Sequence, residues 1–308
     1  MTAAALIAID WGTSNRRAWR IDRWGAVLDR RHDAEGLLAI REARFAESLQ
    51  GLIGDWLAQA PGVPVLMAGM VGSKRGWVEA PYLPTPLALQ TLGQHLHPVA
   101  ELAGSAVRVV PGVCFSSAER PPDVMRGEET QIYGALALSN QDCALLLLPG
   151  THAKWAKVED RVLREFRTYM TGELFGVLRK HSILGQLMEG DLFVEEAFLQ
   201  GLRVSRQAAP GRLLHDLFGV RTRVLFEQLA PTATSSYLSG ILIGAELSDA
   251  CQHFEPGTVQ TILTIGSAEL SALYGAAAGE FGLTLCVMDN DALFPAAMHR
   301  LADAADLL

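Results

Sequence analysis

The amino-acid sequence predicts an α/β protein with two lobes, each formed by a similar succession of strands, tight turns and helices. Two observations lead to this prediction. The chain has 308 residues, whereas a single hydrophobic core stops growing at about 250 to 300 residues. A pattern of three strands joined by short turns and followed by a helix begins near residue 5 and returns, weakly, near residue 144. We therefore expect a duplicated fold, with the functional site in a cleft between the lobes.

The first pattern starts with apolar segments that turn-forming residues separate. The turns WGTSN and RWG join three of these segments into two hairpins. Apolar residues then recur at helical spacing, and a buried strand runs into the glycine-rich loop GMVGSKRGW. The predicted elements are strands 6–10, 17–22 and 26–31, a helix over 42–60, a strand 64–70, a second helix and a strand 106–112.

The second pattern follows a helix expected over 124–138 that links the lobes. It consists of the apolar strand ALLLLPG, the turn THAKW, two further strands and a helix that starts at TGEL. Near the end, TILTIGSAELSALYGAA predicts a strand, a Gly-Ser turn and a helix, and residues 294–308 predict a closing amphipathic helix. The GxxxG spacings Gly240–Gly244 and Gly275–Gly279 predict close helix packing inside a lobe.

Charge and composition exclude several classes of protein. Lysine and arginine number 26 against 34 aspartates and glutamates, and no basic run longer than a doublet occurs, which argues against nucleic-acid binding. The longest strongly apolar run, Ala144–Leu148, is far too short to span a membrane. The N-terminus lacks the basic region of a signal peptide. Four widely spaced cysteines predict reduced, buried thiols without disulfides in a cytoplasmic protein.

The segment IAIDWGTSN has the chemistry of a phosphate-binding turn. Asp10 ends a strand and is followed by Gly12, Thr13, Ser14 and Asn15, whose backbone amides and hydroxyls can surround a phosphate. Asp10 could lie beside a polyphosphate only with a cation or water between them, so we expect it to hold hydrated Mg²⁺. A hairpin turn stabilised by its own side chains is the alternative. The P-loop and GxGxxG patterns are absent.

IAIDWGTSN resembles the first phosphate hairpin of the actin and sugar-kinase superfamily. MAGMVGSKRGWVEAPYL, VMRGEETQIYGAL, LLPGTHAKW and FRTYMTGEL are similar, in the same order, to segments of the 2-dehydro-3-deoxygalactonokinase family. The resemblance implies duplicated RNase H-like lobes: a substrate lobe over 1–120 and a nucleotide lobe over 121–308, with the linking helix near 123–139. It also implies transfer of a phosphoryl group from ATP to 2-dehydro-3-deoxy-D-galactonate, giving the 6-phosphate, and makes a homodimer a reasonable expectation.

Basic residues recur in the segments expected at the site, as binding of an anionic substrate requires. For each of them, a solvated surface position is the alternative. Arg126 is the strongest candidate, because its guanidinium could bind a carboxylate through two parallel hydrogen bonds. Trp77 and Tyr82 could contact the sugar acid or simply pack. The basic residues are Arg16, Arg17, Lys74, Arg75, Arg126 and Lys154, with Arg16 and Lys154 assigned to ATP and Lys74, Arg75 and Arg126 to the sugar acid.

The catalytic base is expected at the start of the linking helix. Sugar kinases of the superfamily have an aspartate there, and this chain has Glu128 and Glu129. Glu129 shares a helix face with Ile132 and Leu136, and burial would make it a better proton acceptor. Acidic residues that only favour the helix N-terminus are the alternative. The choice between the two glutamates stays open.

The resemblance places further phosphate and nucleotide contacts in the second pattern. Gly150, Thr151 and Lys154 replace the Asp-x-Gly that many members have there, and the role of the intervening His152 is left open. Gly266 and Ser267 would lie beside the adenosine, or Ser267 would only cap a helix. His95 and His97, expected on one helix, point different ways, and we predict no transition-metal site.

Other functions on the same fold also fit these patterns. One of them is a kinase of 2-dehydro-3-deoxygluconate, a substrate that differs from the galactonate form at a single hydroxyl group. A phosphatase or acyl-phosphate enzyme, or a sugar-acid sensor without catalysis, would also use this fold. The intact turn after Asp10 favours catalysis over sensing.

Overall fold

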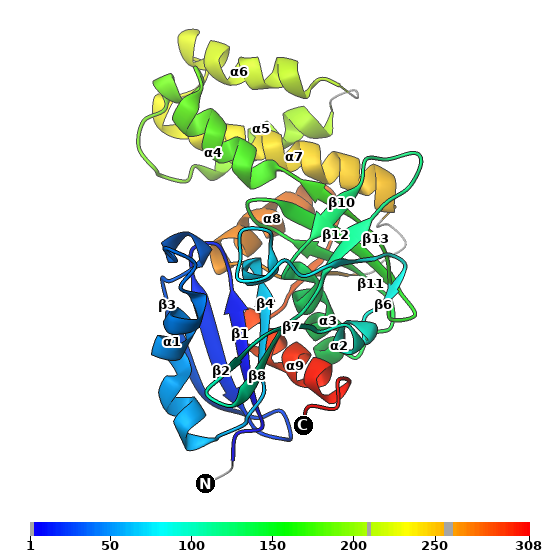
Figure 1. The fold of residues 1–308 in the computed structure, drawn as a ribbon. Helices are drawn as coiled ribbons and strands as arrows, with labels where there is room; N and C mark the ends of the chain where they lie inside the picture. Colours follow the sequence, from blue (N-terminus) through cyan, green and yellow to red (C-terminus); the bar gives the residue numbers. More distant parts are fainter. Residues whose placement is uncertain (1–2, 208–210, 256–260) are drawn as a thin grey trace. The chain divides into compact units, whose positions relative to one another are not determined.

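The computed structural model describes residues 3–207, 211–255 and 261–308, which form two compact units (Figure 1). Unit 1 consists of Met1–Cys143, Val158–Phe166 and Asp289–Leu308, and unit 2 consists of Ala144–Lys157 and Arg167–Met288. Unit 1 therefore extends past the lobe division expected at residue 120. The reason is that the predicted linking helix and the C-terminal helix pack on each other inside unit 1.

Unit 1 is built on a six-stranded sheet whose hairpins follow the sequence prediction. The order is β3-β2-β1-β4-β8-β7; β1 pairs antiparallel with β2 and parallel with β4. Helix α1 (Phe45–Gln59) buries its apolar stripe in the core of this unit, as its spacing predicts. The strands are β1 (Leu6–Trp11), β2 (Arg16–Ile21), β3 (Val27–Asp33), β4 (Val65–Gly69), β7 (His97–Leu102) and β8 (Ser105–Val109).

The second helix expected before β8 is reduced to the four residues of α2 (Thr91–Gln94). Because proline interrupts helices, the prolines of the segment APYLPTP favour the short strands found instead. His95 follows α2 and His97 begins β7, so the prediction that both lie on one helix is wrong. The short strands are β5 (Tyr82–Pro84), β9 (Gly112–Phe115) and β10 (Asp123–Met125), which form a separate sheet, and β6 (Leu87–Ala88), which pairs with the start of β13.

The predicted linking helix is α3 (Glu128–Ser139), which starts later than expected because Asp123–Met125 forms β10. Gly127 separates the two elements with a φ of 104°, a conformation that favours glycine. Helix α9 (Asn290–Asp303) is the predicted closing helix. It lies so close to α3 that a methyl group on Gly134 would collide with the carbonyl oxygen of Leu293.

Unit 2 contains the second copy of the strand pattern. Its order β15-β14-β11-β12-β13 corresponds strand for strand to β8-β4-β1-β2-β3 of unit 1, which confirms the predicted duplication and the RNase H-like fold class. The ends of β12 and β13 that adjoin their connecting turn are counted with unit 1. The strands are β11 (Ala144–Leu148), β12 (Ala153–Glu159), β13 (Val162–Tyr169), β14 (Ile262–Thr264) and β15 (Leu285–Val287).

The described part of unit 2 also contains five α-helices, and four of them, α4 to α7, lie together as one group in Figure 1. A methyl group on Gly240 would collide with the carbonyl oxygen of Phe198, so the close packing predicted at Gly240–Gly244 is confirmed. The prediction of close helix packing is wrong at Gly275–Gly279, where open space surrounds both glycines. The helices are α4 (Thr171–His181), α5 (Glu195–Arg206), α6 (Leu213–Leu225), α7 (Thr234–Phe254) and α8 (Ala268–Glu280).

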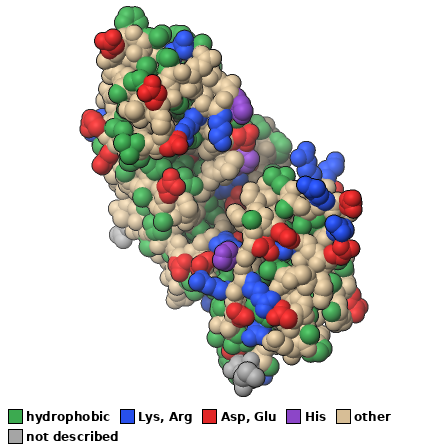
Figure 2. Space-filling view, turned by 90° about the vertical axis from the view of Figure 1, so that its left-hand side faces the viewer, with side chains coloured by type: hydrophobic (Ala, Val, Ile, Leu, Met, Phe, Trp, Pro, Cys, Tyr) green, Lys and Arg blue, Asp and Glu red, His purple; other side chains and the backbone are tan. Residues whose placement is uncertain are grey.

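The surface of the described chain corrects one expectation about the cysteines. All four thiols are free, but Cys143 and Cys286 are exposed because they lie in a turn and on the edge strand β15. Acidic and basic side chains are interspersed on the face shown in Figure 2. None of the described helices is both long and apolar enough to cross a membrane.

Candidate functional site

Asp10 lies near the end of β1, directly across the hairpin from Arg17. Its Oδ2 accepts hydrogen bonds from Nη2 of Arg17 at 2.5 Å and from Nε at 3.2 Å. Burial raises the pKa of the Asp10 carboxyl group, the Arg17 guanidinium lowers it, and the negative charge of Glu128 raises it further. The side chain remains 22% exposed, so a ligand can reach this carboxylate.

The turn between β1 and β2 is fixed from one side. The carbonyl oxygens of Gly12, Thr13 and Ser14 accept hydrogen bonds from the backbone of residues 36–38. A methyl group on Gly36 would overlap the backbone of Ser14, so glycine is needed there for this close approach. Thr13, Ser14 and Asn15 are exposed. The turn therefore holds its shape while presenting the residues expected to meet phosphate.

Arg16 and Arg17 point to opposite faces of β2, as neighbours in a strand must. The Arg16 guanidinium is buried, donates hydrogen bonds to Asp33 and Ser48, and lies 4.6 Å from the ring of Trp11. Arg16 is therefore not brought beside Asp10, whereas Arg17 is. The sequence identifies Arg17 only as a basic residue, although strand alternation across the hairpin distinguishes it from Arg16.

Two glycines bring the start of α3 to the end of β1. Gly69 ends β4 with a φ of 95°, and a methyl group there would lie 2.8 Å from the Trp11 carbonyl oxygen and 3.5 Å from Oδ1 of Asp10. A methyl group on Gly127 would lie 3.3 Å from the Cα of Gly69. Neither glycine was identified from the sequence as a site residue, although both stand at strand or helix ends, where close backbone approach is common.

The two candidate bases differ in accessibility. Glu129 is fully buried, and both of its oxygens accept the backbone N–H of Gly127, at 2.9 and 2.7 Å. Burial, and next the charge of Glu128, raise the pKa of Glu129 to about 7. Glu128 is half-buried, and its Oε2 accepts the backbone N–H of Arg126 at 3.0 Å. The predicted burial of Glu129 is thus confirmed, and Glu128 is the more accessible of the pair.

The Arg126 side chain is buried with much of its hydrogen-bonding capacity unused. Nη2 donates to the Ala80 carbonyl oxygen at 2.7 Å, and the guanidinium lies 4.3 Å from the ring of Tyr82. Nε and Nη1 have no hydrogen-bond partner among the described residues. A methyl group on Gly72 would lie 2.9 Å from Nη1, so this glycine leaves room for the guanidinium.

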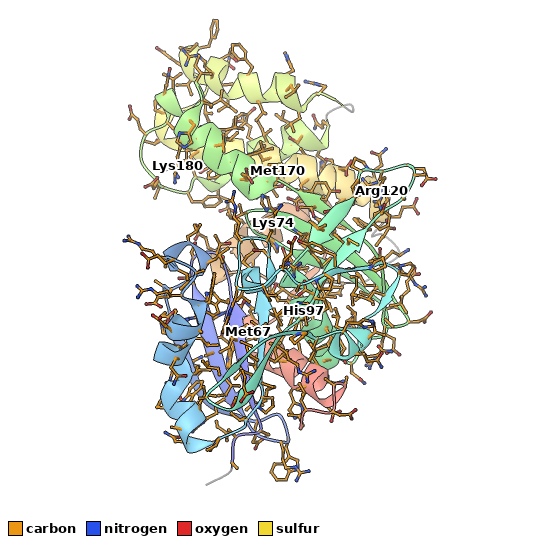
Figure 3. All side chains as sticks on the ribbon, viewed as in Figure 1. Met67, Lys74, His97, Arg120, Met170 and Lys180 are labelled. Atoms are coloured by element: carbon orange, nitrogen blue, oxygen red, sulfur yellow. The ribbon has the colours of Figure 1, made fainter. Side chains whose placement is uncertain are left out.

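The other residues predicted to bind the sugar acid lie in the loop after β4. Lys74, labelled in Figure 3, and Arg75 are exposed. Trp77 is half-buried and stacks on Phe45 with ring centroids 6.2 Å apart. Its packing role is therefore evident.

In unit 2 the turn between β11 and β12 lies against the first turn of α4. The N–H of Glu173 donates to the Thr151 carbonyl oxygen at 2.9 Å, and a methyl group on Gly172 would lie 2.9 Å from the Cα of Thr151. His152 contacts the Glu173 carboxylate. Lys154 is buried, with Nζ 3.4 Å from the carbonyl oxygen of His152. The turn and the helix thus form one connected structure.

The turn between β14 and α8 lies beside this structure. Ile265 donates its N–H to the Leu147 carbonyl oxygen at 3.0 Å, and a methyl group on Gly266 would contact Pro149 at 3.4 Å. Oγ of Ser267 accepts the N–H of Leu270 at 3.2 Å, so the predicted helix cap is confirmed. The two candidate nucleotide turns, at Gly150 and Gly266, are therefore neighbours.

A cavity of about 220 Å³ opens next to these turns, entirely within unit 2. Its wall combines apolar side chains with hydroxyl groups and glycine backbone, a composition typical of small-ligand pockets. Its lining residues include Gly150, Thr171, Gly172, Glu269, Leu270 and Tyr274.

Within the described ranges, no cluster of three or more histidine, cysteine, aspartate or glutamate side chains could hold a metal. Mg²⁺ has a different requirement, because one protein carboxylate with waters and phosphate oxygens suffices for it. Asp10 has a carboxylate that is partly exposed beside the turn Gly12–Asn15. These residues fit that donor set.

Comparison with known proteins places the chain in a specific group. A family profile described as 2-keto-3-deoxy-galactonokinase matches residues 10–301. The 2-dehydro-3-deoxygalactonokinase of Escherichia coli is 35% identical over 306 residues, and a Rhizobium meliloti protein assigned the same activity is 36% identical over 315 residues; each alignment covers 98% of both chains. A crystal structure of a Sinorhizobium meliloti protein, also assigned as 2-dehydro-3-deoxygalactonokinase, has a TM-score of 0.87 at 35% identity, covering 97% of this chain and 98% of that one.

Proposed function

The chain belongs to the 2-keto-3-deoxy-galactonokinase family, and from this premise we propose which residues perform the reaction. The protein is a sugar-acid kinase that uses ATP to phosphorylate 2-dehydro-3-deoxy-D-galactonate, giving the 6-phosphate. The observation that carries the assignment of residues is the buried Arg126 guanidinium, two of whose nitrogens have no hydrogen-bond partner among the described residues.

We assign the substrate carboxylate to Arg126. Burying hydrogen-bond donors without acceptors is costly, so Nε and Nη1 of Arg126 call for an acceptor from outside the described chain. A carboxylate accepts two parallel hydrogen bonds from a guanidinium. Lys74 and Arg75, exposed in the neighbouring loop, would add attraction for the anion.

We assign the catalytic base to Glu128. The base has to reach the substrate hydroxyl within hydrogen-bond distance, which the fully buried Glu129 cannot do without leaving the Gly127 amide. Glu128 is half-buried, and its negative charge raises the pKa of Asp10. Glu128 would accept the proton of the terminal hydroxyl of the substrate. Glu129 would stabilise the bend at Gly127 and thereby orient Glu128.

Nucleotide-binding residues are proposed for each unit by itself. Asp10 would hold Mg²⁺, which supplies charge neutralisation to the phosphates when bound. Thr13, Ser14 and Asn15 of the first turn would offer amides and hydroxyls to phosphate, and Gly150, Thr151 and Lys154 of the second would do the same. The cavity of unit 2 beside Gly266 and Ser267 would take the nucleoside.

An ADP-release assay with matched variants tests the choice of base. Glu128→Gln should lower kcat by about a hundredfold or more, the usual contribution of a general base, with unchanged ADP binding. Glu129→Gln should retain most of kcat. The reverse order of the two effects, or equal turnover in both variants, would refute the assignment of Glu128.

A substrate panel tests the assignment of Arg126 and the preference of the enzyme for the galactonate over the gluconate form of the substrate. The panel contains the galactonate and gluconate forms of the 2-dehydro-3-deoxy acid and an amide in place of the galactonate carboxylate. Wild type should discriminate against the amide, whereas Arg126→Met should not. If wild type phosphorylates the acid and the amide equally well, Arg126 does not bind the substrate carboxylate.

A further inference from the structure

Glu246 is a buried acidic residue of α7 that is neither one of the proposed catalytic residues nor one of the proposed binding residues. Its side chain is 3% exposed and accepts three hydrogen bonds from three other elements. The donors are Nε1 of Trp155 in β12 at 2.9 Å, Oγ1 of Thr171 at the start of α4 at 2.5 Å, and the hydroxyl of Tyr274 in α8 at 2.7 Å. A buried carboxylate needs such partners, because an unsatisfied charge away from water is costly.

Two of the three donors belong to the wall of the unit 2 cavity. Thr171 and Tyr274 both line it, together with Gly150. Thr171 also begins the helix whose first turn lies against the turn between β11 and β12. The N–H of Glu173 donates to the carbonyl oxygen of Thr151, and Gly172 packs on the backbone of both Gly150 and Thr151. A displacement of Thr171 would therefore move the turn assigned to phosphate.

We propose that Glu246 is a positioning residue for the nucleotide, which acts by holding Thr171 and Tyr274 so that the Gly150–Thr151 turn keeps its phosphate-binding shape. This inference rests on the proposed placement of the nucleotide in unit 2. Glu246 itself does not line the cavity. Its effect on the ligand is transmitted through the Thr171 hydroxyl and the first turn of α4.

The chemistry of the three donors explains why a carboxylate is required. The indole N–H of Trp155 can only donate, so it must keep an acceptor. In Glu246→Gln the remaining oxygen can serve Trp155, and the new NH₂ group then faces the hydroxyls of Thr171 and Tyr274. Both hydroxyls would have to turn and accept instead of donating. The substitution keeps the volume of the side chain, but it replaces a carboxylate by a neutral amide and reverses both hydrogen bonds, which weakens the network that holds Thr171.

The test compares ADP affinity, measured by calorimetry, with steady-state kinetics. Glu246→Gln should weaken ADP binding and raise the KM for ATP by about tenfold, the effect of losing a hydrogen bond to a charged group. The KM for the sugar acid should stay unchanged. Thr171→Val, which replaces the hydroxyl by a methyl group, should reproduce the loss, and Thr171→Ser, which keeps the hydroxyl, should bind ADP as wild type does. If Glu246→Gln does not fold, the two Thr171 variants decide the question.

Two controls separate the possible failures. Asp216→Asn changes another buried carboxylate of unit 2, which bonds Arg212 and does not line the cavity; it should leave ADP affinity unchanged. Gly150→Ala has room in the fold but should hinder phosphate. If Gly150→Ala weakens ADP binding while Glu246→Gln and Thr171→Val do not, the role of Glu246 is refuted and the nucleotide site stands. If none of the three changes ADP affinity, the nucleotide placement itself is refuted.

Discussion

Gly127 donates its backbone N–H to both carboxylate oxygens of Glu129, two residues further along the chain. This contact closes the bend between β10 and α3, where Gly127 has a φ of 104°. The Glu128 carboxylate contacts the same bend by accepting the N–H of Arg126. The bend therefore fixes a buried glutamate, an accessible glutamate and a buried arginine relative to one another.

Burial of Glu129 makes stability depend on pH. Its pKa is about 7 in the folded protein and near 4.5 in the unfolded chain. The folded state thus binds the proton more tightly, and stability falls as pH rises from about 4.5 to about 7. The loss is on the order of 3 kcal/mol when Glu129 is fully ionised. Urea denaturation of wild type at pH 5 and pH 8 should reveal this decline.

Glu129→Gln isolates the contribution of this one group. Glutamine keeps an oxygen for the Gly127 amide but cannot ionise, so the variant should lose less stability than wild type between pH 5 and pH 8. Asp10 and Glu246 also have raised pKa values, and both remain in the variant. An identical decline in the two proteins would show that Glu129 is ionised in the folded state at pH 5.

Gly72 should determine how well the protein binds the sugar acid. A methyl group there would lie 2.9 Å from Nη1 of Arg126 and 3.1 Å from Cγ2 of Val109, so Gly72→Ala should displace the guanidinium. The KM for the sugar acid should rise about tenfold, as expected when a charged hydrogen bond is misaligned, with the KM for ATP unchanged. Gly51→Ala, at an open position in α1, should change neither constant.

Arg16 should contribute to stability and not to nucleotide binding. Its buried guanidinium bonds Asp33 and Ser48, so Arg16→Met should lower the free energy of unfolding by about 2 kcal/mol. ADP affinity should stay at the wild-type value. Arg17→Met is the matched variant on the same strand; it should reduce kcat, because Asp10 loses the cation that it contacts. If Arg16→Met loses ADP affinity and Arg17→Met does not, Arg16 contributes to phosphate binding after all.

The parts of the fold that could be predicted from the sequence are those governed by local patterns. The hairpins around Gly12 and Gly25, the stripe of α1 and the cap at Ser267 depend on neighbouring residues, and all are confirmed. The region between β4 and β8 could not be predicted in the same way, because its short strands pair with partners distant in sequence.

The candidate site shows the same limit. Asp10, Glu129 and Arg126 could be proposed from residue type and position, but their relation depends on Gly69 and Gly127, which approach each other across 58 residues. Arg16 was assigned to the nucleotide, and its burial on the far face of β2 depends on Asp33 of the next strand. The buried, hydrogen-bonded position of Glu246 could not be predicted from the sequence, because its three partners lie in three other elements.

Two helix glycines of unit 2 provide a test of the packing between α5 and α7. At Gly240 a methyl group would collide with the Phe198 carbonyl oxygen and lie 3.0 Å from the Leu202 amide nitrogen, so Gly240→Ala must push the helices apart. We expect a loss of about 1–3 kcal/mol in the free energy of unfolding, the usual cost of overpacking. Gly275→Ala, in open space on α8, should instead gain about 0.5–1 kcal/mol, because alanine favours the helix. Chemical denaturation of both variants measures the difference; a neutral Gly240→Ala would mean that α5 and α7 are not in close contact at this glycine.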